Sequence, residues 1–163
     1  MAATIQKRHL TGAAADAELK RFIDKFEPKH RTLIRAARKA LQERFPGACE
    51  LVYDNYNFFV IGFSPTERPS DAIVSLTANA SGLGMCFLRG ATLRDPQKIL
   101  LGSGNQTRFI RLDSIEVLSH PAVKALIAAA TAQSRVALPG GGRGPLIIRS
   151  VSAKQRPRRT TTR

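Results

Sequence analysis

Two residue types that often carry chemistry are scarce in this chain. Its 163 residues include no tryptophan and only two cysteines, Cys49 and Cys86. The cysteines are not in a CxxC spacing and have no histidine pair nearby, so the sequence predicts neither a zinc site nor a structural disulfide. We interpret both as small apolar residues of the interior, and we expect neither a metal nor a cofactor.

Long apolar runs are missing as well. No segment approaches the ~20 apolar residues that a membrane span requires, and the opening stretch MAATIQKRHLTG has no apolar core of the kind found in secretory signals. These absences predict a protein of the cytoplasm with no membrane partner. The hydrophobic content of 43% is nevertheless enough for the core of one compact domain.

Acidic residues are outnumbered, since 12 Asp and Glu stand against 26 Lys and Arg, for a net charge of +14. Seven of the basic residues lie in the last 21 residues, which contain no acid. We interpret residues 139–163 as a Gly-rich joint followed by a basic, mostly disordered tail. Such a tail can bind nucleic acid weakly through phosphates, or it can serve only to keep the protein in solution. The candidate nucleic-acid contacts are Lys154, Arg156, Arg158, Arg159 and Arg163.

One part of this tail is too apolar for a purely disordered segment. Leu146, Ile147 and Ile148 are consecutive. Residues 145–151 can therefore add a strand to a sheet edge or dock on a partner chain, and the sequence leaves these alternatives open.

Helical periodicity is clear in three places. Between residues 16 and 26 apolar side chains recur at i, i+3, i+4 and i+7, which is typical of an amphipathic helix. A second pattern runs from about residue 29 to residue 45 and ends at Pro46-Gly47. A third begins near Ser119, where we interpret His120, which precedes Pro121, as a helix-start residue.

Between the second and third helical patterns the apolar period changes to two. Short turns join consecutive apolar segments there, which favours an antiparallel sheet with helices on one face. The predicted fold class is α+β, a single domain over residues 16–138 in which two N-terminal helices and one C-terminal helix pack on about five strands. Residues 1–15 are expected to form a flexible N-terminus. The predicted strands are 50–54, 57–63, 72–78, 83–90 and 105–112.

The stretch Gly102-Ser103-Gly104-Asn105 looks at first like a phosphate-binding loop. A dinucleotide fingerprint would need a third glycine where Thr107 stands, and a helix after it, whereas an alternating strand pattern follows. The Gly-Lys-Ser/Thr of a P-loop is also absent. We therefore interpret these glycines as a turn that leads into a strand.

A family resemblance rests on these same segments. Residues 86–112, CFLRGATLRDPQKILLGSGNQTRFIRL, resemble the second half of the YdhG-like domain of unknown function, a bacterial family that includes the frataxin-like iron chaperones named Fra. ACELVYDNYNFFVIGF resembles the first hairpin of that family, with Glu50 after the Pro46-Gly47 stop. The resemblance spans roughly residues 16–133 and implies an α+β fold. The shared pattern is Phe87-Leu88, Gly90, Leu93, Asp95-Pro96, Leu100 or Leu101, Gly102-Ser103-Gly104 and Arg108.

The chain departs from the family at one turn. Asn55-Tyr56-Asn57 stands where many members have Gly-Met-Pro after the first strand, so any function tied to that turn does not transfer. The relatives suggest an intracellular iron chaperone as the alternative function. Hard cations prefer oxygen ligands, but the acids of the first helix are interleaved with Lys and Arg, and the second helix is basic, which argues against capture of Fe²⁺.

No motif for catalysis is present. The histidines have no serine or cysteine in a recognisable nucleophile motif nearby, and no carboxylates are paired at a diagnostic spacing. We predict a non-enzymatic binding or accessory module with no catalytic residues, for an unknown small ligand or protein partner. Glu50 can bind a ligand on a sheet rim, or it can simply pair with a surface arginine. The candidate ligand residues are Glu50, Tyr53, Asp54, Tyr56 and Arg108.

Overall fold

The computed structural model describes residues 5–160, with side chains from Leu10 onward. No helix in this range is long and apolar enough to cross a membrane. Three short 3-10 helices lie in the connections, at Pro69–Asp71, Gly90–Thr92 and Ile115–Ser119. In chain order the other elements are β1 (Ile5–Leu10), α1 (Gly12–Asp24), α2 (Pro28–Arg44), β2 (Cys49–Asp54), β3 (Phe59–Ser64), β4 (Val74–Asn79), β5 (Gly82–Phe87), β6 (Arg108–Leu112), α3 (Pro121–Ala132) and β7 (Leu146–Ser152).

The α+β fold class is confirmed, but the sheet is larger than the expected five strands and it is mixed. Its described strands follow the order β1-β7-β2-β3-β4-β5-β6. The five predicted strands are β2 to β6, which pair antiparallel as an up-and-down meander. The two further strands come from near the ends of the chain. β7 runs parallel to β2 and antiparallel to β1, so the sheet is not purely antiparallel.

These two strands correct the expected domain boundaries. Within the supposedly flexible 1–15, residues 5–10 form β1, and residues 1–4 lie outside the described part. Within the supposedly disordered 139–163, the apolar triplet 146–148 is buried in β7. Burial of these three side chains offsets the entropy of ordering the segment. The extra strand at 145–151, left open by the sequence, is therefore present.

The expected Gly-rich joint is a site of close packing. The Gly140 N–H donates to the carbonyl oxygen of Pro46 over 3.2 Å. Gly47 has φ of +77°, and a Cβ there would collide with the backbone of Gly140. A Cβ on Gly144 would collide with the carbonyl of Ala48. These glycines allow two backbone segments to touch, which a flexible joint would not do.

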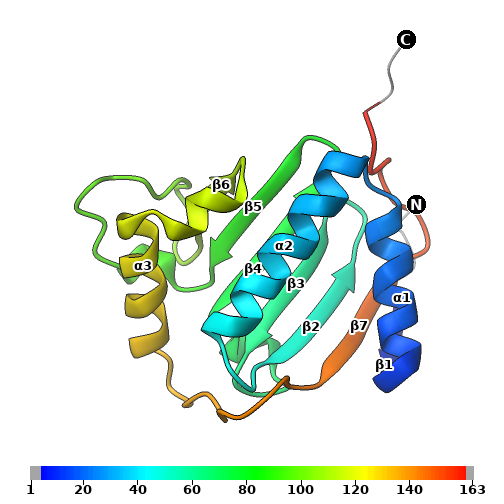
Figure 1. Cartoon of the computed structure of the whole chain (residues 1–163), viewed down its shortest axis with the longest axis horizontal. Coiled ribbons are helices and arrows are strands. Elements are labelled where there is room, and N and C mark those ends of the chain that lie inside the picture. The colour runs from blue at the N-terminus through cyan, green and yellow to red at the C-terminus, as the bar shows by residue number, and fades with distance from the viewer. Residues whose placement is uncertain (1–4, 161–163) are drawn as a thin grey trace.

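The helices cover one face of the sheet, with α1 and α2 lying in front of the strands in Figure 1. Aromatic side chains fill the space between these layers. The Phe26 ring centroid lies 5.9 Å from that of Phe59, and the centroids of Phe45 and Phe63 are 6.0 Å apart. α3 contributes Leu126 and other apolar residues to the same core. On the opposite face the buried cluster is small, comprising Cys49, Leu51 and Ile147, with Tyr53 against it.

Two of the helices begin at a proline. Pro28 and Pro121 stand at the first positions of α2 and α3, where the missing N–H costs nothing. His120 is confirmed as a helix-start residue, because its Nδ1 accepts a hydrogen bond from the backbone N–H of Ala122 over 3.2 Å.

Candidate functional site

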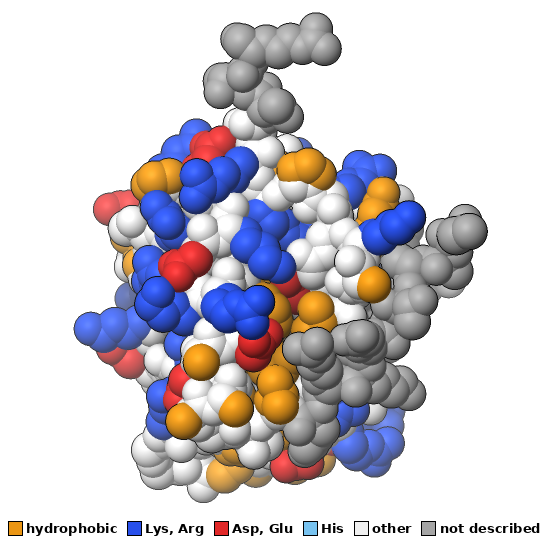
Figure 2. Space-filling view, turned by 90° about the vertical axis from the view of Figure 1, so that its right-hand side faces the viewer, with side chains coloured by type: hydrophobic (Ala, Val, Ile, Leu, Met, Phe, Trp, Pro, Cys, Tyr) orange, Lys and Arg blue, Asp and Glu red, His pale blue; other side chains and the backbone are white. Residues whose placement is uncertain are grey.

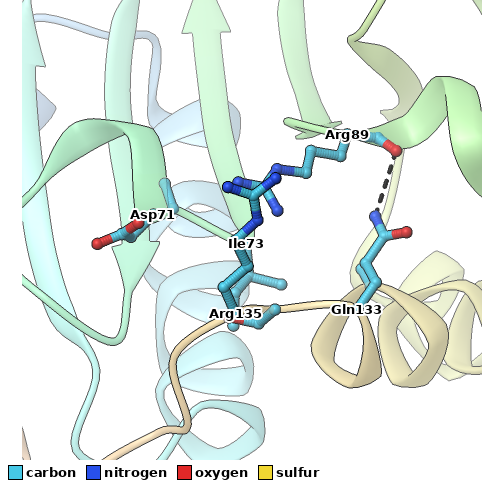
Figure 3. Close-up of a pocket in the computed structure, with 8 residues that line it drawn as sticks. Asp71, Ile73, Arg89, Gln133 and Arg135 are labelled. Carbon is cyan, nitrogen blue, oxygen red and sulfur yellow. Dashed lines mark hydrogen bonds between the residues drawn. The ribbon is translucent and has the colours of Figure 1, made fainter.

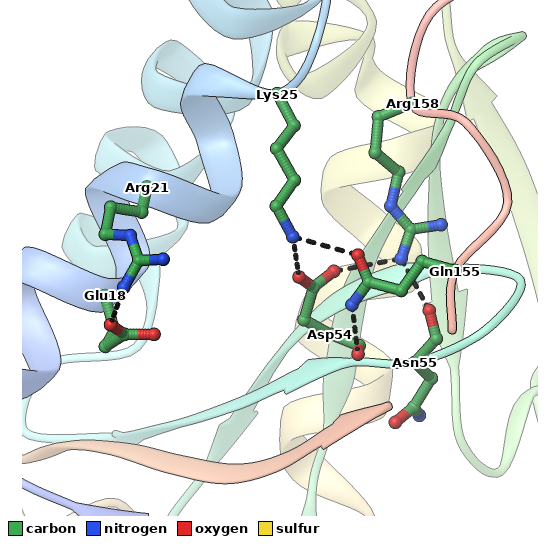
Figure 4. A network of polar contacts seen from close by, with 7 residues as sticks. All are labelled: Glu18, Arg21, Lys25, Asp54, Asn55, Gln155 and Arg158. Atoms are coloured by element: carbon green, nitrogen blue, oxygen red, sulfur yellow. Dashed lines mark hydrogen bonds and ion pairs between the residues drawn. The ribbon is translucent and has the colours of Figure 1, made fainter. Parts of the chain in front are cut away.

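Asp54 is a buried carboxylate at the end of β2, and two cations hold it (Figure 4). Lys25, just after α1, donates from Nζ to Oδ2 over 2.7 Å. Arg158 donates from Nη2 to Oδ1 over 2.9 Å. Gln155 accepts from Lys25 Nζ over 2.9 Å and donates to the Asp54 carbonyl over 2.8 Å. Each Asp54 oxygen thus has a charged donor from a different segment, which is how proteins tolerate a buried charge.

Residues 153–160, which we call the C-terminal strap, lie against the domain. Arg158 is 4% exposed and donates to the Asn55 carbonyl as well as to Asp54. Its Nε and Nη1 are buried and have no hydrogen-bond partner among the described residues. Arg159 donates from Nε to the Lys25 carbonyl over 3.1 Å, near the C-terminal end of α1. The strap is therefore docked, which corrects the expectation of a disordered tail.

This docking leaves fewer free cations than the sequence suggested. Of the five candidate nucleic-acid contacts, Arg158 is committed to a buried ion pair and Arg159 to helix carbonyls. Lys154 and Arg156 remain exposed, and Arg163 lies outside the described residues.

The acids of α1 are also neutralised. Figure 2, the view onto the α1 side, shows many Lys and Arg side chains with acidic ones set among them. The pairs are Arg21 with Glu18, Lys20 with Asp24 at 2.8 Å, Arg35 with Asp24 at 2.9 Å, and Arg143 with Asp16 at 2.7 Å. Such exposed pairs contribute little stability each, but they leave no group of free carboxylates on this helix.

Glu50 lies beneath α2. It is 2% exposed, and Arg38 donates to it from Nε over 2.6 Å and from Nη2 over 3.2 Å. Gln42 donates to the same carboxylate over 2.6 Å. The arginine-pairing alternative for Glu50 is the one the structure supports, although the pair is buried and not on the surface. A carboxylate with three donors is held for structure, with no free edge for a ligand.

The five predicted ligand residues do not form one site. Glu50 and Asp54 face the helices and are enclosed, whereas Tyr53 lies on the opposite face of β2. Tyr56 is in the β2–β3 turn, with the Arg156 guanidinium 5.8 Å from its ring centroid. Arg108 is three strands away on β6 and donates to the carbonyls of the preceding loop.

The Gly102–Gly104 loop is a turn before β6, as the sequence predicted. Gly102 has φ of +110°, a conformation that favours glycine. Gly104 does not have a positive φ, and its missing Cβ would meet nothing within 4 Å. Arg108 Nη1 donates to the Gly104 carbonyl over 2.5 Å. The loop is therefore bound by a side chain of the protein's own β6.

The face of the sheet away from the helices carries a groove of about 820 Å³. Small side chains on β4 and β5 form its floor, and larger side chains on β3 and β6 form its walls. The strand alternation explains this, because the large apolar residues of β4 and β5 point to the helices. The lining residues on this face include Phe58, Val60, Thr77, Asn79, Gly82, Gly84, Cys86, Phe109, Arg111 and Asp113.

Strand register aligns four of these residues in one row. Val60 pairs with Thr77, Thr77 with Gly84, and Gly84 with Arg111. Gly84 therefore places a residue without a side chain between Thr77 and Arg111. In the neighbouring row Cys86 pairs with Phe109, which is 36% exposed, and Phe58 on the other wall is 44% exposed.

The groove continues past the β4–β5 turn to the first turn of α2, where Lys29, His30 and Leu33 line it. His30 is 9% exposed, and its Nδ1 has no hydrogen-bond partner among the described residues. A Cβ on Gly82 would lie 3.9 Å from His30 Nε2. That distance is an ordinary contact, so glycine is favoured at position 82 by its φ of +143° and not by lack of space.

The charged side chains of the groove are two cations and one acid, Lys29, Arg111 and Asp113. Among the described side chains, none of the three forms an ion pair within the chain. The groove combines exposed aromatic walls with a cationic rim, which suits a ligand that has both an apolar and a polar part.

The thiol on the groove floor is not activated. Burial raises the pKa of Cys86 above its ordinary value, against a smaller opposing effect of a hydrogen bond with Thr77. A thiol with a raised pKa is protonated at neutral pH and is a poor nucleophile. Burial raises the pKa of Cys49 in the same direction.

A second hollow, between the β5 end and the segment after α3, holds only about 20 Å³ (Figure 3). The side chains of Arg89 and Arg135 both extend toward Ile73, and Asp71 points away from them. Gln133 Nε2 donates to the Arg89 carbonyl over 3.2 Å and fixes the two segments together. The hollow has room for about one water molecule, so it offers no space for an organic ligand.

No group of three or more His, Cys, Asp or Glu side chains placed to hold a metal ion occurs in residues 10–160. Comparisons of the chain with protein-family models, with curated proteins and with solved structures found no match.

The groove residues are ones that sequence reasoning missed. The signal was present in the strand alternation, because β4 and β5 carry Ser75, Thr77, Gly84 and Cys86 on one face and large apolar residues on the other. The pattern does not predict that the face with the small residues stays uncovered. Whether a face is covered depends on where each helix packs.

Proposed function

We propose that the protein is a non-enzymatic binding module that takes a small amphipathic ligand in the groove on the uncovered face of its sheet. The observation that carries this proposal is the groove itself, which holds about 820 Å³ over its whole length, from the floor of small residues between Phe58 and Phe109 to the first turn of α2. Small-molecule sites typically enclose roughly 300–1,000 Å³ with apolar walls and a few polar groups. The groove has this size and this composition.

The exposure of its aromatic walls supports the proposal. Phe58 and Phe109 are among the five large hydrophobic side chains that the described surface exposes most. Apolar side chains gathered on one concave face gain free energy when a ligand removes them from water. The protonated thiol of Cys86 and the three-donor engagement of Glu50 are consistent with binding rather than catalysis.

The two other functions considered from the sequence keep less support. For an iron chaperone, the two buried carboxylates Glu50 and Asp54 are already bound by cations. For nucleic acid, the strap offers Lys154, Arg156 and Arg159 as exposed basic groups, although Arg159 also donates to the Lys25 carbonyl. The YdhG-like resemblance stays a prediction.

The test uses the neutral dye N-phenyl-1-naphthylamine, whose fluorescence rises in apolar sites. We expect saturable binding to the full chain. Thr77→Tyr, which fills the groove floor with a larger side chain, should weaken it. Thr107→Tyr is the matched control, because Thr107 is exposed and lies outside the groove lining. Equal binding by the two variants would place the dye elsewhere and defeat the proposal.

A chemical readout locates the ligand independently. In a Cys49→Ala background Cys86 is the one thiol of the chain. Because Cys86 lines the groove, a bound dye should slow its alkylation by iodoacetamide at mildly alkaline pH. An unchanged alkylation rate at saturating dye would contradict binding in the groove.

A further inference from the structure

We infer that the ligand of this groove is an organic anion, with its charged group at Arg111 and its apolar body on the floor beside Gly84. This inference rests on the proposed function and specifies its ligand. It is argued from the position of one guanidinium, the balance of charge around it and the width of the groove.

Arg111 lies at the edge of the groove floor. Register places it next to Gly84, and Thr77 follows on the far side of the glycine. A glycine there leaves the backbone of β5 bare beside the guanidinium. A side chain has little room at Gly84, because a Cβ there would come within 3.2 Å of the Ile110 carbonyl oxygen and 3.3 Å of Thr77 Oγ1. The floor next to Arg111 is therefore closely packed backbone.

Counted over its whole lining, the groove has two cations and one acid. Arg111 has no ion-pair partner among the described side chains, and the nearest acid along its strand that lines the groove is Asp113. Lys29 adds a second cation from α2, although it also lies close enough to Glu27 to lower the pKa of that carboxyl, behind the larger effect of the Thr160 hydrogen bond. A guanidinium with free donors beside an apolar wall recognises a carboxylate, sulfonate or phosphate through charge-assisted hydrogen bonds.

The apolar part of the ligand has a defined width. The walls stand on β3 and β6, which are separated by three strand spacings, or about 14 Å between backbones. Val60 and Phe109 occupy opposite sides of this span, with only small side chains between them. A body of two fused or linked rings fits there with one face on the floor. The structure therefore points to an aromatic or cyclic organic acid.

The test compares two dyes that share one ring system. 8-Anilinonaphthalene-1-sulfonate carries a sulfonate, and N-phenyl-1-naphthylamine is its neutral counterpart. We expect the sulfonate to bind more tightly to the full chain, and Arg111→Gln to weaken the sulfonate by roughly ten- to a hundredfold, the range that one hydrogen bond to a charged group supports. The same variant should leave the neutral dye unchanged.

Arg94→Gln is the matched control, because it removes the same charge from an exposed position that does not line the groove. If Arg94→Gln weakens the sulfonate as much as Arg111→Gln does, general attraction to a basic protein explains the result and the inference is wrong. If both dyes bind equally and Thr77→Tyr weakens both, the proposed function stands and the anion preference falls. If Thr77→Tyr affects neither dye, the groove is not a ligand site, and both fail.

A measurement of mass tests whether a second copy of the chain covers the groove. Light scattering should give the mass of a single chain for both the natural protein and Thr77→Tyr. A dimer that dissociates in Thr77→Tyr would mean that a second copy covers the groove, and this outcome also overturns the inference.

Discussion

The guanidinium of Arg158 donates to a carboxylate oxygen of Asp54 over 2.9 Å, although 104 positions separate the two residues in the chain. Both side chains are buried, at 2% and 1% exposure. Breaking a buried ion pair leaves a charge without water and without a full set of partners, which costs far more than the loss of a surface pair. This contact therefore ties the strap to the fold.

Replacement of Arg158 should destabilise the protein. Arg158→Met keeps much of the side-chain volume but leaves Asp54 with Lys25 as its remaining cation, and we expect a loss of about 3 kcal/mol in the free energy of unfolding. The control is Arg156→Met, two residues away and exposed, with an expected loss below about 0.5 kcal/mol. Urea unfolding followed by circular dichroism measures both. Similar values for the two variants would mean that the strap does not contribute to stability.

The turn before β6 gives a prediction that separates two glycines. Gly102 has φ of +110°, so Gly102→Ala is expected to cost roughly 1 kcal/mol or more through backbone strain. Gly104→Ala should be neutral or slightly stabilising, because Gly104 lacks a positive φ and its Cβ would meet open space. Thermal unfolding of the two variants distinguishes them. A larger loss at Gly104 would contradict the described loop.

The strap also lowers the pKa of Glu27. The hydroxyl of Thr160 donates to Glu27 Oε1 over 2.6 Å and is the main cause that holds the pKa of Glu27 below 4.5. Because the folded-state pKa is lowered, the stabilisation is present above the unfolded pKa and is lost as the pH falls through the folded value. Thr160→Val should therefore raise the pKa of Glu27, and its effect on stability should shrink toward acidic pH.

NMR titration of the aspartate and glutamate side chains measures this shift. Asp24 serves as the internal control, since hydrogen bonding to Lys20 is the main cause that lowers its pKa, and that contact is unchanged in the variant. A Glu27 titration curve identical in Thr160→Val and in the natural protein would show that the strap does not reach α2.

Local pattern accounts for most of the fold. The period-two segments and their short turns place β2 to β6 correctly, because each strand pairs with its neighbour in sequence. The apolar triplet of β7 was visible, but its place between β1 and β2 was not, because no turn connects β7 to either strand. Charge count alone suggested a free tail, and it was misleading because Arg158 finds its acid at Asp54, in a strand remote in sequence.

For the candidate site, too, the sequence predicted some features and missed others. The candidate acids Glu50 and Asp54 were singled out as polar residues near a sheet rim, yet each is enclosed by helix or strap side chains. Thr77 and Gly84 looked unremarkable along the chain, and only their register next to Arg111 makes them part of a groove. Sequence reports the face to which a side chain points, whereas packing decides whether that face meets water.

The position of β7 sets an order of events during synthesis. β1 is made first, but its partner in the sheet is β7, and β7 lies between β1 and β2. Residues 5–10 therefore have no strand to pair with until residues 146–152 have left the ribosome. The meander β2 to β6 and the helices can assemble earlier through contacts closer in sequence. The sheet edge at β2 stays open until then, so this side of the sheet closes after the meander has been made.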